Sequence, residues 1–136
     1  MASELQGTWK LAESVNFDAY MKAVGVGFAL RKIGNATKST VSIESSDPEA
    51  VKIVTSSTFS THRLECPLGK VVDQQTVDGR NCKTVVNWKN DVLVQEESWN
   101  GKTTSISRHV NESGNLIAEL RMGDVVAKRI YEKTSA

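Results

Sequence analysis

Residues 81–132 have the sequence NCKTVVNWKNDVLVQEESWNGKTTSISRHVNESGNLIAELRMGDVVAKRIYE, in which five alternating runs are separated by short turn signals. The runs are Asn81–Trp88, Val92–Trp99, Thr103–Val110, Leu116–Met122 and Val125–Glu132. The turns between them contain Lys89-Asn90-Asp91, Asn100-Gly101, Asn111–Asn115 and Gly123-Asp124. Strands of this length, joined by tight turns rich in Asn and Gly, are typical of antiparallel hairpins. This part of the chain is therefore predicted to form an up-and-down β-meander.

The same period of two extends toward the N-terminus. Further strands are predicted in or around Gln6–Ser14, Val41–Ile43, Val51–Ile53, Thr58–Leu64 and Lys70–Asp73. A sheet of about ten strands avoids exposed edges by closing into a barrel, and a barrel of more than about eight strands holds a cavity. The predicted fold class is all-β: a ten-stranded up-and-down antiparallel β-barrel (β-clam), forming a single domain over residues 1–136.

One segment, between Asn16 and Ala36, has a helical pattern instead. Its apolar residues first recur at the spacing of one helical face, at Phe17, Tyr20, Met21 and Val24. Asn16 is expected to act as the N-cap. Gly25 and Gly27 then interrupt the run. The segment is predicted to form two short helices, inserted between the first two strands as a lid over one end of the barrel.

Composition excludes several classes of protein. The chain has 136 residues and a formal net charge of +1, which gives no support to nucleic-acid binding. The N-terminus has no basic start or apolar run, and Ala2 excludes N-myristoylation, so a cytoplasmic location is expected. The size of the chain leaves diffusion into the nucleus open. Cys66 and Cys82 can form a disulfide or remain free, and a reducing cytosol favours two free thiols.

No catalytic motif or metal-ligand spacing is found, so we expect neither an enzyme nor a cofactor or metal.

Two arginines are the residues of chemical interest. In the run 103–110, Arg108 shares a face with Thr104 and Ile106, whereas the opposite face is uniformly polar, so Arg108 is predicted to point inward. In the last run, Arg129 and Tyr131 share one face, but both faces are mixed. Hydropathy alone does not choose between an inward and a surface position there.

The chain resembles the intracellular lipid-binding proteins, and in particular the heart, adipocyte and peripheral-myelin branch of the fatty-acid-binding proteins. The resemblance covers the whole chain with almost no gaps. It is carried by the segments Gly7–Leu11, Asn16–Ala29, Ser57–Phe59, Asp78–Arg80, Trp99–Lys102 and Val125–Lys133.

The resemblance implies a cavity that binds one long-chain fatty acid reversibly and without covalent chemistry. Arg129 and Tyr131 match the family's Arg-x-Tyr pair, and Arg108 matches its second arginine, so these three are expected to hold the carboxylate. The other matching cavity and portal positions are Phe17, Tyr20, Met21, Val26, Phe59, Val77, Asp78, Ile106, Ala118 and Leu120. For the apolar members, plain core packing is the alternative. Glu97 is a departure from the family at an inward position, where it can pair with one of the two arginines.

The lid segment is basic. Lys22, Arg31 and Lys32 match basic lid positions, which predicts transient docking on anionic membranes; an ordinary solvated helix face is the alternative. A carrier of retinoic acid would share the arginine arrangement, and a membrane-stacking structural protein is a rival from another class. The protein is expected to be a monomer.

Overall fold

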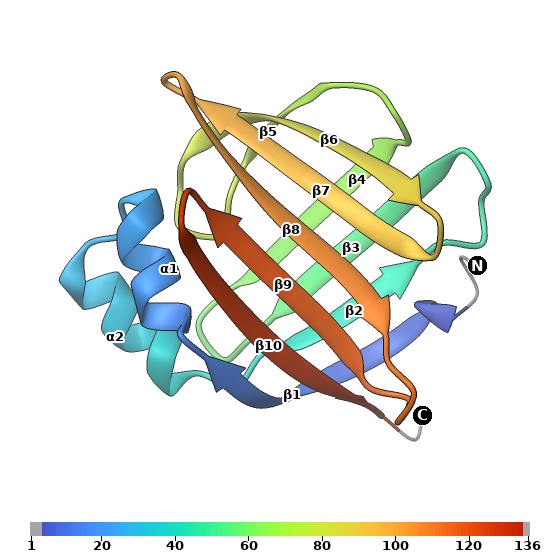
Figure 1. Cartoon of the computed structure of the whole chain (residues 1–136), viewed down its shortest axis with the longest axis horizontal. Coiled ribbons are helices and arrows are strands. Elements are labelled where there is room, and N and C mark those ends of the chain that lie inside the picture. The colour runs from blue at the N-terminus through green and yellow to red at the C-terminus, as the bar shows by residue number, and fades with distance from the viewer. Residues whose placement is uncertain (1–3, 135–136) are drawn as a thin grey trace.

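In the computed structural model of the chain, which describes residues 4–134, ten antiparallel strands belong to one sheet (Figure 1). The expectations drawn from Met1 and Ala2 lie outside the described residues. The strands are β1 (Gly7–Val15), β2 (Thr40–Glu44), β3 (Ala50–Ser56), β4 (Thr61–Pro67), β5 (Val72–Gln75), β6 (Asn81–Lys89), β7 (Val92–Trp99), β8 (Lys102–Val110), β9 (Leu116–Met122) and β10 (Val125–Lys133). The helices α1 (Phe17–Val24) and α2 (Phe28–Ala36) lie between β1 and β2. The predicted fold class is confirmed.

Strand order explains how the sheet becomes a barrel. The order is β4-β3-β2-β1-β10-β9-β8-β7-β6-β5, so the first strand pairs with the last. The ladder between them runs from Trp9 opposite Lys133 to Val15 opposite Lys128, with an irregularity between Leu11 and Glu13. A bulge of this kind increases the local twist and bends the strand, which helps a sheet to curl.

The barrel is nearly closed, because its two edge strands, β4 and β5, are linked by side chains rather than by a backbone ladder. The Nε2 atom of His62 lies 2.5 Å from the Gln75 carbonyl oxygen. The Gln74 amide donates to the Arg63 carbonyl at 2.9 Å. We call this region, formed by His62, Arg63, Gln74 and Gln75, the β4–β5 seam.

Two predicted strands are shifted along the chain. Residues predicted to start the fourth strand form a turn instead, in which the Ser57 amide donates to the Ser60 carbonyl and the Ser57 hydroxyl accepts from Phe59. Strand β4 therefore begins at Thr61 and continues to Pro67. Strand β5 begins at Val72 rather than Lys70. In the first case the turn hydrogen bonds override the β-propensity of the flanking residues.

The lid helices cover one end of the barrel beside β10 (Figure 1). Helix α1 buries Tyr20, Met21 and Val24, as its period predicts, while α2 buries none of its residues. Asn16 occupies the N-cap position of α1, as predicted, but its side chain makes no capping hydrogen bond. It has a left-handed backbone (φ 61°), and its side-chain amide donates to the Val126 carbonyl in β10 at 2.9 Å.

The turn between the helices depends on a glycine. Gly25 has φ 100°, and the amide of Val26 reaches back to the Met21 carbonyl at 2.9 Å. This is a Schellman-type ending, in which the left-handed residue is usually Gly because other residues pay a steric cost. Gly27, two residues on, has an extended backbone with φ −70°.

This difference predicts unequal effects for two substitutions. An added Cβ meets no atom within 4 Å at either glycine. Gly25→Ala should lower the free energy of unfolding by about 1–2 kcal/mol, because its backbone is left-handed. Gly27→Ala should have a smaller effect, because its backbone suits any residue and the gain from restricting the unfolded chain opposes the poor N-capping of α2 by Ala. Urea unfolding measures both, and equal effects would contradict this view of the turn.

Candidate functional site

Arg108 lies inside the barrel, on the inward face of β8. Its side chain is buried, and its Nη1 atom donates to the Gln95 amide oxygen on β7 at 2.8 Å. Removal from water lowers the pKa of Arg108, because burial disfavours the charged form. The guanidinium is therefore a buried cation that donates to the neutral amide of Gln95.

Arg129 and Tyr131 lie on the inward face of β10, next to the buried Ala127. The Arg129 guanidinium stacks on the ring of Phe17, with its carbon 3.9 Å from the ring centroid. Its Nε atom is buried and has no hydrogen-bond partner within residues 4–134. Burial lowers the pKa of Arg129, and the neighbouring Tyr131 opposes that shift. Hydropathy did not decide between an inward and a surface position for Arg129 and Tyr131, and the structure places both on the inward face.

The remaining predicted residues divide into two groups. Tyr20, Met21, Val26, Ala118 and Leu120 are buried, and Phe17 and Ile106 are partly buried against the same core. Phe59 and Val77 are instead 67% and 61% exposed, on the turns that precede β4 and β6. The structure does not bring these two together with the others.

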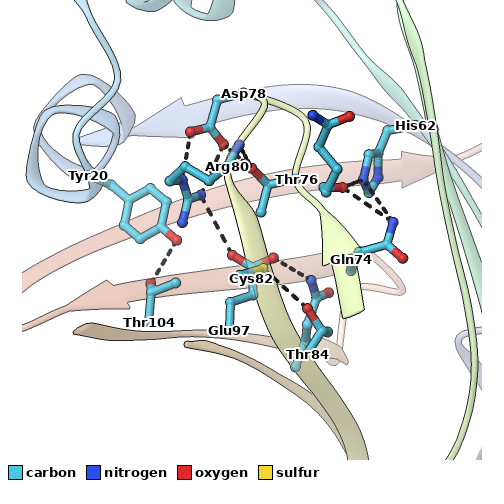
Figure 2. Close-up of polar contacts among 12 residues, drawn as sticks. Tyr20, His62, Gln74, Thr76, Asp78, Arg80, Cys82, Thr84, Glu97 and Thr104 are labelled. Atoms are coloured by element: carbon cyan, nitrogen blue, oxygen red, sulfur yellow. Dashed lines mark hydrogen bonds and ion pairs between the residues drawn. The ribbon is translucent and has the colours of Figure 1, made fainter. Parts of the chain in front are cut away.

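A buried polar network at the lid end of the barrel was not anticipated from the sequence (Figure 2). Arg80 binds the Asp78 carboxylate through two nitrogens, at 2.6 and 2.9 Å, and its guanidinium lies 4.3 Å from the Trp99 ring centroid. Its Nη2 atom is also 3.7 Å from Glu97. The Gln95 amide donates to Glu97 at 2.9 Å, and its oxygen accepts from Arg108. The network connects the turn before β6 with the carboxylate-binding candidates.

The expectation that Glu97 pairs with Arg108 or Arg129 is therefore wrong. Its ion-pair partner is Arg80, and Gln95 separates it from Arg108. Two sequence signals point to this arrangement in retrospect. Asp78 and Arg80 flank Gly79 in a tight turn, and Gln95 and Glu97 have the same parity on β7.

Burial sets the protonation behaviour of the two acids. Burial raises the pKa of Glu97, and the opposing effect of Arg80 does not cancel it. Burial also acts to raise the pKa of Asp78, but hydrogen bonds from Arg80 and Thr76 outweigh it and hold that pKa below the ordinary value. Asp78 is therefore the charged partner of Arg80, while the charged form of Glu97 is disfavoured.

The lid cations differ in their surroundings. Lys22 and Lys32 are exposed, whereas Arg31 is half-buried and fastens the two helices together. It donates to the Asp18 carboxylate at 3.2 Å and to the Val26 carbonyl at 2.8 Å. The outer face of α2 also exposes apolar side chains, with Phe28 73% exposed and Leu30 51% exposed.

Several other features bear on function. Cys66 and Cys82 are both free and buried. Within residues 4–134, no group of three potential metal ligands gathers, and no helix is long and apolar enough to cross a membrane.

Comparison with known proteins identifies the architecture. Residues 6–134 match the lipocalin / cytosolic fatty-acid binding protein family. The chain belongs to this family. It is 43% identical to fatty acid-binding protein 5 of Bos taurus, over 96% of this chain and 95% of the relative. It is 41% identical to the adipocyte fatty acid-binding protein of Pygoscelis papua, over 98% and 99%.

Among solved structures, a Schistosoma mansoni fatty acid binding protein in complex with arachidonic acid has a TM-score of 0.92 and 37% identity, covering 98% of each chain. Members of this cytosolic family are non-enzymatic lipid carriers. Membership of the family therefore confirms the prediction that the chain is not an enzyme. A cytoplasmic location is consistent with the family.

The raised pKa of Glu97 predicts a pH-dependent effect of Glu97→Gln. Since the folded-state pKa lies above the unfolded value, wild-type stability falls as the pH rises from about 4.5 through the folded-state pKa. Gln at this position keeps an acceptor for Gln95 without the charge. The variant should therefore gain stability relative to the wild type at neutral pH and lose that gain below pH 4.5.

Urea unfolding at the two pH values provides the measurement. Glu96→Gln, on the outer face of the same strand, controls for the change in net charge. A Glu97→Gln effect that does not vary with pH would show that the loss of the Arg80 contact, rather than ionisation, dominates.

Proposed function

We propose that the protein is a carrier that reversibly binds one long-chain fatty acid inside the barrel, with Arg108, Arg129 and Tyr131 holding the carboxylate. The observation that carries this proposal is the unpartnered Nε–H of Arg129, buried beside Tyr131. A buried guanidinium donor without a partner is costly, and a carboxylate is the group that matches its planar donors best.

The balance of charge inside the barrel supports binding of an anionic ligand. Three inward-facing cations, Arg80, Arg108 and Arg129, face two inward-facing acids, Asp78 and Glu97. Positive groups are therefore in excess even with both acids ionised, and the raised pKa of Glu97 increases that excess. A fatty-acid carboxylate supplies negative charge in a region of low dielectric, where an uncompensated cation is costly.

The apolar lining supplies the driving force for the acyl chain. Met21, Ala118 and Leu120 are buried around the same interior as the arginines. Burial of a methylene contributes about 0.8 kcal/mol, so a 16-carbon tail has roughly 10 kcal/mol of gross driving force. Immobilisation of the chain offsets part of this gain.

The lid is proposed to deliver the ligand by touching anionic membranes. Exposed cations at Lys22 and Lys32 accompany exposed apolar residues at Phe28 and Leu30. A basic residue near an anionic surface contributes about 1 kcal/mol, and apolar side chains can enter the interfacial region. Arg31 is assigned a different role here, because its guanidinium already binds within the lid.

Retinoic acid is a second carboxylate ligand that the same three residues can hold, and competition with oleate measures the preference. A monomeric state and passage into the nucleus by diffusion are also proposed, because the chain is small and one copy forms the barrel by itself.

Replacing Arg129 with Leu tests the carboxylate site. Oleate affinity should fall by about 1.5–3 kcal/mol, the range for a hydrogen bond to a charged group, which is roughly 10- to 150-fold. Tyr131→Phe should cost less, because it removes one neutral donor. Isothermal titration calorimetry on each variant gives the affinities.

Oleyl alcohol is the matched ligand control, since it has the same chain without a carboxylate. It should bind the wild type and Arg129→Leu within a few-fold of each other. Unchanged oleate affinity in Arg129→Leu would mean that the carboxylate is held elsewhere, and Arg108 would be tested next.

Neutralising the exposed lid lysines tests delivery. Lys22→Gln combined with Lys32→Gln should slow fatty-acid transfer to anionic vesicles, because less charge attracts the lid, and should leave equilibrium affinity nearly unchanged. Lys70→Gln combined with Lys89→Gln, two exposed positions at the opposite end of the barrel, is the control with the same net charge. Stopped-flow transfer of a fluorescent fatty acid measures the rates. Wild-type rates that are equal for anionic and zwitterionic vesicles would rule out electrostatic docking.

A further inference from the structure

A second group of polar side chains, which does not include Arg129 or Tyr131, faces the interior at the lid end. Figure 2 shows Tyr20 of α1, Thr104 of β8, Glu97 of β7 and Arg80 converging there. Tyr20, Thr104 and Glu97 are at most 5% exposed. A carrier that held only a carboxylate and a hydrocarbon tail would gain from apolar residues at these positions, because buried polar groups are costly unless they are matched.

The single hydroxyl proton of Thr104 fixes the directions of the hydrogen bonds in this group. The Thr104 hydroxyl donates to the Arg121 carbonyl at 2.6 Å. It has no second proton, so in its 2.8 Å contact with Tyr20 it must accept, and Tyr20 donates. The Tyr20 oxygen therefore keeps its own acceptor capacity.

Arg80 brings a donor without a partner to the same place. Its Nε and Nη2 atoms bind Asp78, but its Nη1 atom is buried and makes no hydrogen bond within the described part of the chain. Two guanidinium groups in the interior thus have an orphaned buried N–H, one on Arg129 and one on Arg80. The unpartnered N–H of Arg129 supports the proposed carboxylate site. By the same argument, the unpartnered N–H of Arg80 is available to another ligand oxygen.

The two places are distinct but adjoining. Arg108 lies opposite Leu93, whereas Thr104 lies opposite Glu97, four residues along the same β7–β8 ladder. The Gln95 amide joins their polar groups, because it accepts from Arg108 and donates to Glu97. A carboxylate held by Arg108, Arg129 and Tyr131 leaves the Arg80 Nη1 donor to another ligand oxygen, which can be carried on the acyl chain.

We propose that Arg80, Glu97 and Tyr20 form a second subsite that binds a hydroxyl group carried on the chain of a long-chain fatty acid. Arg80 Nη1 donates to the hydroxyl oxygen, and the Glu97 carboxylate or the Tyr20 oxygen accepts its proton. A ligand hydroxyl can accept from Arg80 and donate to Glu97 or Tyr20 at the same time, whereas a methylene leaves the donor and the acceptors unmatched. The inference rests on the proposed function, because the chain is positioned by its carboxylate.

The test compares oleate with ricinoleate, which is oleate carrying a mid-chain hydroxyl, by titration calorimetry. The wild type should bind ricinoleate about tenfold more tightly than oleate, which corresponds to the lower end of a hydrogen bond to a charged group. The double variant Arg80→Gln/Glu97→Gln should lose this preference. Oleate affinity is measured on the same variant, so that the ratio of the two affinities, rather than either one alone, gives the result.

Asp73→Asn/Lys83→Gln, which removes an exposed ion pair on the neighbouring strands, is the matched control and should keep the preference. If the double variant does not fold, Tyr20→Phe is a smaller change that serves as the test instead, and it should reduce the preference for ricinoleate. Equal wild-type affinities for the two ligands would overturn the subsite and indicate that water satisfies Arg80. A preference retained in both variants would overturn the assignment to these residues. A wild type that binds neither ligand would refute the proposed function itself.

Discussion

The pairing of β1 with β10 is the constraint on which the rest of the structure depends. Until the first strand pairs with the last, both faces of the sheet are exposed to water. The two alternating sets of side chains on each strand are then not yet divided into inward and outward positions. Once Trp9 lies opposite Lys133 and Val15 opposite Lys128, every inward position becomes part of one enclosed space. Arg108 and Arg129 then become buried cations rather than surface residues.

Several neutral contacts make those buried cations tolerable in the folded chain. Phe17 presents the face of its ring to Arg129, Trp99 does the same for Arg80, and Gln95 accepts from Arg108. Cation–π contacts and amide acceptors reduce the desolvation cost without cancelling the charge. Within the described residues, the interior consequently retains an excess of positive groups and an unpartnered N–H on both Arg80 and Arg129, an arrangement that favours binding over maximal stability.

Most of the fold could be predicted from the sequence, because the patterns that define its strands, turns and helices are local. Period-two runs, tight turns and the i, i+3, i+4 pattern of α1 require only neighbouring residues, and they predicted the number and order of the elements, with β4 and β5 shifted by two or three residues. The errors came where a distant partner decides. The Asn16 side chain bonds to Val126 instead of to the first turn of the helix that Asn16 begins, and Glu97 pairs with Arg80 from a turn that lies next to it only in three dimensions. The inward face of Arg129 could be inferred only from resemblance, because both faces of its strand are mixed.

The β4–β5 seam has a consequence for association between molecules. Two strands that face each other without a ladder keep unpaired backbone groups, which could template pairing with another chain. Strand β5 is only four residues long, and charged side chains at Arg63, Glu65 and Asp73 point away from the interior along these edges. Short length and outward charge are devices by which natural sheets discourage edge-to-edge aggregation. The barrel can therefore leave one side unladdered and still resist joining its neighbours through that side.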